Sequence, residues 1–251
     1  MPDNPVGFCF LSAVPLRSDP TDCAEMVDQF IFADTFDLLE RQEKWTYVRS
    51  HYDGYEGWLD NKQFKLLNVR QYEEVRHWQS KGSYGRSIRI DGVFVPVPVG
   101  ARYPVEQLGT FAFCGMKITT MDSVPEESLL ETAFSFYRTP YLWGGKTFGG
   151  VDCSGFVQVV FRSHGVRMYR NASQQAEQGV IVSSVDEALP NDLCFFSNES
   201  GRIIHVGIYL GENRIIHASG MVRVDVLDAE GIYNEETRCY THKLSVIRRV
   251  L

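Results

Sequence analysis

The sequence lacks the features that mark membrane-spanning, nucleic-acid-binding and disulfide-rich proteins. No apolar run approaches the roughly 20 residues that a transmembrane helix needs. The formal net charge is −7, and no run of lysine and arginine forms a basic face for nucleic acid. The six cysteines have neither the density of a disulfide scaffold nor the C-x-x-C spacing of a zinc module. We therefore expect no membrane and no nucleic-acid partner.

The first residues also lack the positive charge of a secretory leader. An acid, Asp3, and no base precede the apolar stretch Gly7–Leu16, whereas a signal peptide needs a basic start. The sequence therefore predicts a cytoplasmic protein with reduced thiols. A periplasmic or secreted protein is the alternative if a leader has been removed from the chain.

What is present is the composition of a globular protein of 251 residues, 44% of them hydrophobic and 23% charged. This length predicts one large domain or two to three small ones. Closely spaced strand-like pieces predict a small β-barrel over residues 1–66. These pieces are Val14–Arg17, Phe36–Glu40, Trp45–Arg49 and Gly57–Leu59.

Residues 67–120 are harder to assign, and the sequence leaves two interpretations open. Gln71–Gln79 is typical of a helical turn, and Val93–Val99 alternates like an edge strand that prolines interrupt. The segment is therefore either a linker or a second small barrel.

Residues 121–251 predict a domain of the α+β class, with helices followed by an antiparallel sheet. Ser123–Glu127 is typical of a helix start. Apolar residues at helical spacing follow it, at Leu129, Leu130, Ala133 and Phe134. A second helix is expected after Asp152-Cys153-Ser154-Gly155. Strands are expected at Asp192–Phe196, His205–Leu210, Arg214–Ala218 and Leu244–Val250.

One motif in this domain points to a nucleotide site that other residues exclude. Gly145-Lys146-Thr147 looks like the end of a phosphate-binding loop, but the glycine needed five residues earlier is Pro140. Proline has no N–H to donate to a phosphate, so nucleotide binding through this motif is rejected.

The strongest chemical signal is Cys153 at the expected helix start. A thiolate is the reactive form of cysteine, and the N-terminus of a helix lowers a thiol pKa through its dipole and its free N–H groups. We therefore expect a depressed pKa for Cys153. A cysteine before a helix is more often structural than catalytic, so the assignment depends on where histidines lie.

Two histidines are predicted to share one face of the sheet. A three-residue hairpin loop at Gly211–Asn213 would pair Leu210 with Arg214 and Gly207 with His217. In that register His205 pairs with Ser219, and both imidazoles lie diagonally adjacent on neighbouring strands. A loop of two or four residues would place them on opposite faces.

A Cys–His–His set suits nucleophilic catalysis. His205 would accept the proton of the Cys153 thiol and return it to the leaving amine, while His217 would orient His205. The same residues with Asp152 are also plausible zinc ligands, but they lack a compact ligand repeat. We expect neither a metal nor another cofactor.

Several motifs occur in the order found in the NlpC-type cell-wall cysteine peptidases, which the chain resembles from Ser135 to its end. They are Tyr141-x-Trp143-Gly144-Gly145, Asp152-Cys153-Ser154-Gly155-Phe156, Asp192-Leu193-x-Phe195-Phe196, His205-Val206-Gly207-Ile208-Tyr209 and Ile215-Ile216-His217-Ala218. The resemblance implies a papain-like fold with Cys153 as nucleophile, His205 as base and His217 as third member. One departure is Cys194, where an aliphatic residue is usual.

The N-terminal segment resembles the bacterial SH3-type domains attached to such peptidases. The similarity covers residues 10–62 and rests on Val14-Pro15-Leu16-Arg17, Ala24-Glu25-Met26-Val27, Trp45-x-x-Val48 and Gly54-Tyr55-Glu56-Gly57-Trp58. In the similar subgroup this domain blocks one end of the cleft and binds the substrate's free α-amine with an acid and a tyrosine. Glu25 and Tyr55 match these positions best. The alternative is that Glu25 is a solvated acid and Tyr55 a packing residue.

The resemblance implies a γ-D-glutamyl-L-diamino acid endopeptidase that acts on small murein peptides with a free N-terminal L-Ala. By the same resemblance the substrate pocket is lined by Tyr141, Trp143, Asp152, Ser154 and Ser173. We expect a monomer whose partners are these peptides. A secreted endopeptidase that remodels intact peptidoglycan and a non-catalytic cell-wall-binding module are the alternatives.

Overall fold

The computed structural model describes residues 4–80, 87–104, 109–120 and 127–251. The chain forms two compact units, the first comprising Met1–Glu127 with Arg162–Gly165 and the second Ser128–Phe161 with Val166–Leu251. The domain boundary predicted near residues 121–125 lies outside the described residues, as does most of the helix start predicted at 123–127. No helix in the described ranges is long and apolar enough to cross a membrane.

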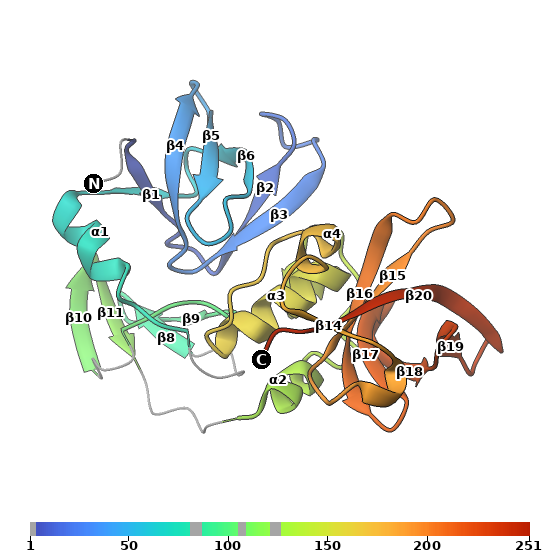
Figure 1. Ribbon diagram of the computed structural model, residues 1–251. Coiled ribbons are helices and arrows are strands. Elements are labelled where there is room, and N and C mark those ends of the chain that lie inside the picture. Colours follow the sequence, from blue (N-terminus) through green and yellow to red (C-terminus); the bar gives the residue numbers. More distant parts are fainter. Residues whose placement is uncertain (1–3, 81–86, 105–108, 121–126) are drawn as a thin grey trace. The chain divides into compact units, whose positions relative to one another are not determined.

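The first unit contains a strongly bent seven-stranded antiparallel sheet (Figure 1) with the strand order β3-β2-β6-β5-β4-β1-β7. Four of its strands, β2, β4, β5 and β6, coincide with the strand-like pieces in the sequence, while β1, β3 and β7 are additional. The strands are β1 Val6–Phe8, β2 Ala13–Arg17, β3 Met26–Ile31, β4 Thr35–Arg41, β5 Trp45–Ser50, β6 Glu56–Asp60 and β7 Lys65–Leu67.

Within 67–120, the described residues form a helix and a second, four-stranded sheet with the order β10-β11-β8-β9. The proline-bearing strand β9 pairs with β8 alone and so lies at the sheet edge, as its prolines predict. The helix is shorter than predicted and begins earlier. The elements are α1 Val69–Val75, β8 Ser87–Ile90, β9 Val93–Pro96, β10 Gly109–Phe113 and β11 Met116–Thr120.

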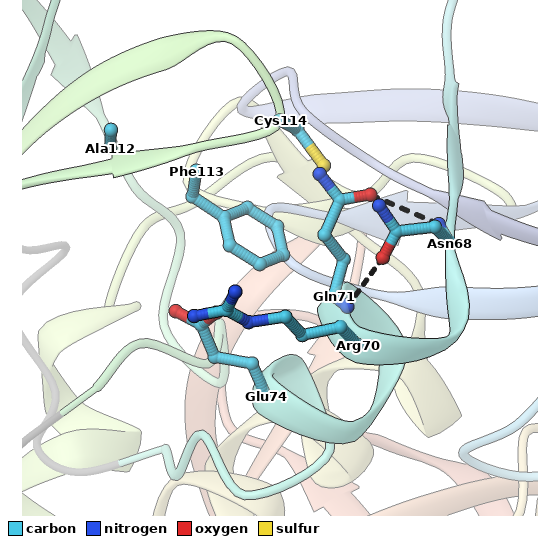
Figure 2. Close-up of a pocket in the computed structure, with 7 residues that line it drawn as sticks. All are labelled: Asn68, Arg70, Gln71, Glu74, Ala112, Phe113 and Cys114. Carbon is cyan, nitrogen blue, oxygen red and sulfur yellow. Dashed lines mark hydrogen bonds between the residues drawn. The ribbon is translucent and has the colours of Figure 1, made fainter.

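Helix α1 begins at Val69 because Asn68 caps it. The Asn68 side chain accepts a hydrogen bond from the Gln71 N–H at 2.9 Å, and the Gln71 side chain accepts one from the Asn68 N–H at 3.0 Å. Figure 2 shows this capping box at one side of a hollow whose other side is formed by Ala112, Phe113 and Cys114 of the β10–β11 hairpin.

One apolar core joins both sheets of the first unit. Phe8 and Phe32 come from the first 66 residues, whereas Trp78 and Phe113 come from residues 67–120, and all four are buried in the same cluster. The Phe8 ring lies edge-on to Trp78 at 6.3 Å and to Phe113 at 5.2 Å between centroids. The core of the second sheet is therefore completed by residues of the first 66, while the first sheet has a further core of its own.

The second unit is built on a curved antiparallel sheet in which β15 to β20 close into a ring, because β19 pairs with both β18 and β20. The short strand β14 extends this sheet beside β20. Its strands are β14 Val180–Val182, β15 Leu193–Ser197, β16 Ile203–Gly211, β17 Arg214–Ser219, β18 Met221–Leu227, β19 Gly231–Asn234 and β20 Cys239–Arg249. β15, β16, β17 and β20 match the predicted strands.

Three helices and a small hairpin precede this sheet in the chain, and a 3₁₀ turn follows β14. They are α2 Leu129–Ser135, the hairpin of β12 Lys146–Thr147 and β13 Gly150–Val151, α3 Cys153–Ser163, α4 Ala172–Gln175 and the 3₁₀ turn Val185–Glu187. Helix α2 starts later than predicted because Ser128 forms a capping box with Glu131. As a result its buried face contains Leu129 and Ala133 but not Phe134, which is 46% exposed.

We expect Phe8→Ala to lower the free energy of unfolding of the first unit by about 3–5 kcal/mol, because the substitution leaves a cavity between the two sheets. Phe94→Ala is the matched control, since Phe94 is 55% exposed. Chemical denaturation of the full chain followed by tryptophan fluorescence tests this, as Trp45, Trp58 and Trp78 all report on this unit. Equal losses in the two variants would contradict a shared core.

Candidate active site

Cys153 is the first residue of helix α3, and its side chain is buried. The helix start lies against the Gly144-Gly145 loop so closely that a Cβ on Gly155 would be 2.3 Å from the Gly145 carbonyl oxygen. A glycine at position 155 is therefore required for the loop and the helix to meet. This contact places Tyr141 and Trp143, which precede the loop, near the same end of the helix.

Asp152 holds the loop and the helix start together. Its carboxylate accepts hydrogen bonds from the N–H groups of Gly144 at 2.8 Å and Gly155 at 2.7 Å. The Arg170 guanidinium donates to both carboxylate oxygens, at 3.0 and 2.5 Å. Burial opposes ionisation of Asp152, but Arg170 and the two N–H groups outweigh it and lower the pKa.

The Asp152 and Ser154 side chains are both occupied by protein partners. Asp152 also accepts a hydrogen bond from the Ser154 hydroxyl at 3.3 Å, which brings its donors to five, about the capacity of a carboxylate. The Ser154 hydroxyl itself accepts a hydrogen bond from Arg170 at 2.9 Å. Their contribution is to position Cys153, and direct contact with a substrate stays a prediction.

The depressed pKa expected for the Cys153 thiol is wrong. Burial and the neighbouring Asp152 carboxylate raise the pKa to about 11, although the N–H of Val206 and the Arg170 charge act in the opposite direction. The helix N-terminus does not compensate for the loss of water around the sulfur and for the adjacent negative charge. At neutral pH the resting thiol is therefore protonated.

His205 on β16 and His217 on β17 lie on one face of the sheet and form a hydrogen bond. Nε2 of His205 is 2.9 Å from Nδ1 of His217, and both side chains are buried. Gly207 pairs with His217, as the hairpin argument predicts. A Cβ at Gly207 would be 2.9 Å from the His217 Cβ, so this pairing also requires a glycine.

The loop that produces this register differs from the predicted one. Gly211, not Leu210, pairs with Arg214, and the register shifts by one residue between Tyr209 and Gly211. Glu212 and Asn213 both have positive φ angles, of 50° and 56°, as the central residues of a type I′ turn require. The turn therefore has two residues, and a β-bulge restores the parity that a two-residue loop alone would have lost.

Asp225 was not predicted from the sequence, yet it continues the contact beyond His217. Its Oδ2 is 3.0 Å from Nε2 of His217, and the carboxylate is buried. Arg223 donates a hydrogen bond to Oδ1 at 3.0 Å. Burial opposes ionisation of Asp225, but His217 and Arg223 outweigh it and lower the pKa. The alternating sequence of β18, Met221–Leu227, was the available signal for this strand.

His242 on β20 was also missed, and it packs face to face on His205. The ring centroids are 4.1 Å apart with an interplanar angle of 24°. Burial and the neighbouring histidines lower the pKa of His205 well below its usual value. Burial and His217 lower that of His242 to about 4. Both rings are therefore neutral at neutral pH.

The three histidines do not make a good metal site, although their nitrogens lie within 4.8 Å of one another. Both nitrogens of His217 are engaged, one by His205 and one by Asp225. The nearly parallel rings of His205 and His242 cannot both direct an in-plane lone pair at one ion. Asp152, the fourth ligand of the zinc alternative, is saturated by its protein partners.

The remaining predicted pocket residues divide between the two units. The pKa of Tyr141 is raised to about 12, chiefly by burial and further by the negative charges of Cys153 and Asp152. The phenol therefore lies within electrostatic range of the thiol. Trp143 is 58% exposed, and Ser173 is exposed on α4.

Glu25 and Tyr55 belong to the first unit, and Cys153 belongs to the second. Tyr55 packs on the core of the first sheet, and the Glu25 carbonyl accepts a hydrogen bond from the Ser18 N–H at 3.0 Å. Their action on a common substrate with Cys153 stays a prediction.

Alkylation of Cys153 by iodoacetamide should become faster as the pH rises, with a midpoint above that of free cysteine in the same buffers, because the buried thiol resists ionisation. Site-resolved mass spectrometry of the full chain measures this rate, with exposed Cys23 as the internal reference for reagent activity. A Cys153 midpoint below that of free cysteine would show instead that the resting site holds a thiolate and an imidazolium.

Parts of the chain are similar to known protein families. Residues 138–241 match the NlpC/P60 family, and residues 16–64 match the bacterial dipeptidyl-peptidase Sh3 domain. A gamma-D-glutamyl-L-lysine dipeptidyl-peptidase of Bacillus subtilis is 36% identical over 123 residues, which are 46% of this chain and 41% of that protein. The match thus spans about two fifths of that relative's length.

Two further matches extend over most of the chain. Dipeptidyl-peptidase 6 of Lysinibacillus sphaericus is 26% identical over 247 residues, covering 86% of this chain and 89% of that protein. A crystal structure of an NlpC/P60 family protein from Bacillus cereus has the same fold, with a TM-score of 0.80 at 19% identity over 98% of this chain and 99% of that one. The chain therefore contains a bacterial SH3 domain followed in the sequence by an NlpC/P60 family domain.

Proposed function

We propose that this protein is a cysteine peptidase that hydrolyses the γ-D-glutamyl-L-diamino acid bond of murein peptides with a free N-terminal L-Ala. The observation that carries the proposal is the hydrogen bond between His205 and His217, on the strand pair beside Cys153. The Val206 N–H, next to His205 in the chain, acts on the Cys153 sulfur. These contacts support the proposed roles, which are those of papain-like enzymes, with Cys153 as nucleophile, His205 as base and His217 as orienting group.

The neutral resting state defines the order of proton transfers. His205 accepts the thiol proton as the sulfur of Cys153 attacks the γ-carbonyl carbon of D-Glu. The developing oxyanion is stabilised by the N–H of Cys153 at the helix start. The imidazolium of His205 then protonates the leaving amine of the diamino acid, and a thioester remains on Cys153. Water, deprotonated by His205, hydrolyses the thioester and restores the thiol.

The substrate class is supported by the relatives. The names of both curated relatives describe dipeptidyl-peptidases, and one of them specifies the γ-D-glutamyl-L-lysine bond. The first domain matches a type of SH3 domain described from bacterial dipeptidyl-peptidases. A dipeptidyl-peptidase must recognise the amine two residues before the cleaved bond, which is the role proposed for Glu25 and Tyr55.

Digestion of defined muropeptides tests the proposed bond and substrate. The protein should release L-Ala-γ-D-Glu from L-Ala-γ-D-Glu-L-Lys or its diaminopimelate analogue, and Cys153→Ala should abolish release because it removes the nucleophile. Cys194→Ala is the matched control, since Cys194 is also a buried free cysteine of this unit but belongs to its apolar core. Faster cleavage of intact peptidoglycan than of free peptides would favour a remodelling enzyme, and no cleavage of either would favour a binding module.

Glu25→Ala should lower kcat/KM about 10- to 150-fold on the free-amine tripeptide, since a charge-assisted hydrogen bond contributes about 1.5–3 kcal/mol and ~1.4 kcal/mol corresponds to one decade. The substitution should have little effect on an N-acetylated tripeptide, which has no ammonium group to bind. Glu43→Ala, at an exposed acid of the same unit, is the control. Equal losses on both substrates would mean that Glu25 only supports the fold.

A further inference from the structure

The carboxylate of Asp225 continues the chain of hydrogen bonds that begins at His205. We propose that Asp225 is a positioning residue that fixes the tautomers of His217 and His205 and leaves Nδ1 of His205 as the basic nitrogen. This role rests on the proposed peptidase function, because it concerns the base in that mechanism.

The three residues lie on a diagonal across three neighbouring strands. Gly207 of β16 pairs with His217 of β17, so His205 is two residues away on the same face. His217 pairs with Arg223 of β18, so Asp225 is again two residues away on that face. Side chains on such diagonals are within reach of each other. The sheet register therefore sets both contacts, at 2.9 and 3.0 Å.

The proton positions follow from Asp225, because an ionised carboxylate can only accept hydrogen bonds. His217 must donate to Asp225 through Nε2–H, so Nδ1 of neutral His217 carries a lone pair. That lone pair can accept a hydrogen bond only from Nε2–H of His205. The proton of neutral His205 is thus on Nε2, and its Nδ1 is the free base.

Arg223 keeps the carboxylate charged and oriented. It donates to Oδ1 at 3.0 Å and forms an ion pair with Oδ2 at 2.8 Å. In an Asp225→Asn variant the amide oxygen would turn to the guanidinium, and the amide N–H would point to Nε2 of His217. His217 would then carry its proton on Nδ1 and donate it to Nε2 of His205. This leaves His205 protonated at Nδ1, which is the wrong tautomer for a base.

The groups around the diagonal offer a matched control. Glu236 pairs with the same Arg223 guanidinium at 3.4 Å, but its side chain is 74% exposed, whereas Asp225 is buried beside His217. Glu236→Gln therefore removes one negative charge beside Arg223, as Asp225→Asn does, without offering an N–H to His217. His242, the other titratable group packed on His205, is unchanged in both variants.

The test is the tautomeric state of the histidines, read from long-range ¹H–¹⁵N correlation spectra of the full chain labelled at histidine. Wild type and Glu236→Gln should carry the proton on Nε2 in both His205 and His217, and Asp225→Asn should carry it on Nδ1 in both. Substitutions to alanine at each of the six histidines assign the signals. A proton on Nδ1 of His217 in the wild type would overturn the proposal, even if Asp225→Asn does not fold.

Kinetics on the tripeptide complete the test. Asp225→Asn should lower kcat about 10²- to 10⁴-fold, the range that general acid–base catalysis contributes, with KM nearly unchanged. Unchanged tautomers in Asp225→Asn, or inverted tautomers with unchanged kcat, would each overturn the proposal. Because the tautomers are read without substrate, this outcome is separate from a failure of the proposed peptidase activity.

Discussion

The hydrogen bond between His205 and His217 is the interaction on which the site depends, and the backbone of the sheet determines it. It requires Gly207 to pair with His217, and it requires position 207 to carry no side chain. The type I′ turn after β16 shifts the strands by one residue, and the bulge at Leu210 shifts them back. Loss of either the one-residue shift at the turn or the bulge would turn one imidazole to the opposite face of the sheet.

The surroundings of Cys153 provide hydrogen-bond acceptors for the buried N–H groups at the start of α3 and in the neighbouring loop. The Asp152–Arg170 pair achieves this by bonding the loop at Gly144, the helix at Gly155 and the hydroxyl of Ser154 at once. The cost is a negative charge beside the thiol, which raises the thiol pKa. The Cys153 thiol and the His205 imidazole are therefore both neutral at rest, and in the proposed mechanism the thiolate forms only when His205 accepts the proton.

Much of this arrangement could be predicted from the sequence because it follows local rules. Alternation and turn residues indicated β2, β4, β5 and β6, and the spacing of His205 and His217 around a hairpin indicated a shared face. His242 could not be placed, because its position depends on which strands pair in the closed ring. Asp225 was overlooked, since Gly220 alone separates β17 from β18 and a glycine between two strands indicates a tight turn that pairs them.

The predictions for the Cys153 pKa, the start of α2 and the hairpin loop were wrong because each applied a local rule where another feature decides the outcome. A helix N-terminus is expected to lower a thiol pKa, but burial and the fixed Asp152 carboxylate depend on the tertiary structure and outweigh it. The start of α2 was misplaced because two capping signals occur close together, and Ser128 with Glu131 is the one used. The three-residue loop was inferred from Gly211-Glu212-Asn213, and the shared face of the histidines followed from it. The structure reaches the same face with a two-residue turn and a bulge.

Trapping of the covalent intermediate tests the central claim of this account most directly. The full chain is mixed with L-Ala-γ-D-Glu-L-Lys, quenched in acid within the first turnover, and analysed by intact-mass measurement and peptide mapping. The account predicts a transient acyl group of the L-Ala-γ-D-Glu dipeptide, bound as a thioester to Cys153. Product formation without any such adduct, or an adduct on another residue, would contradict it.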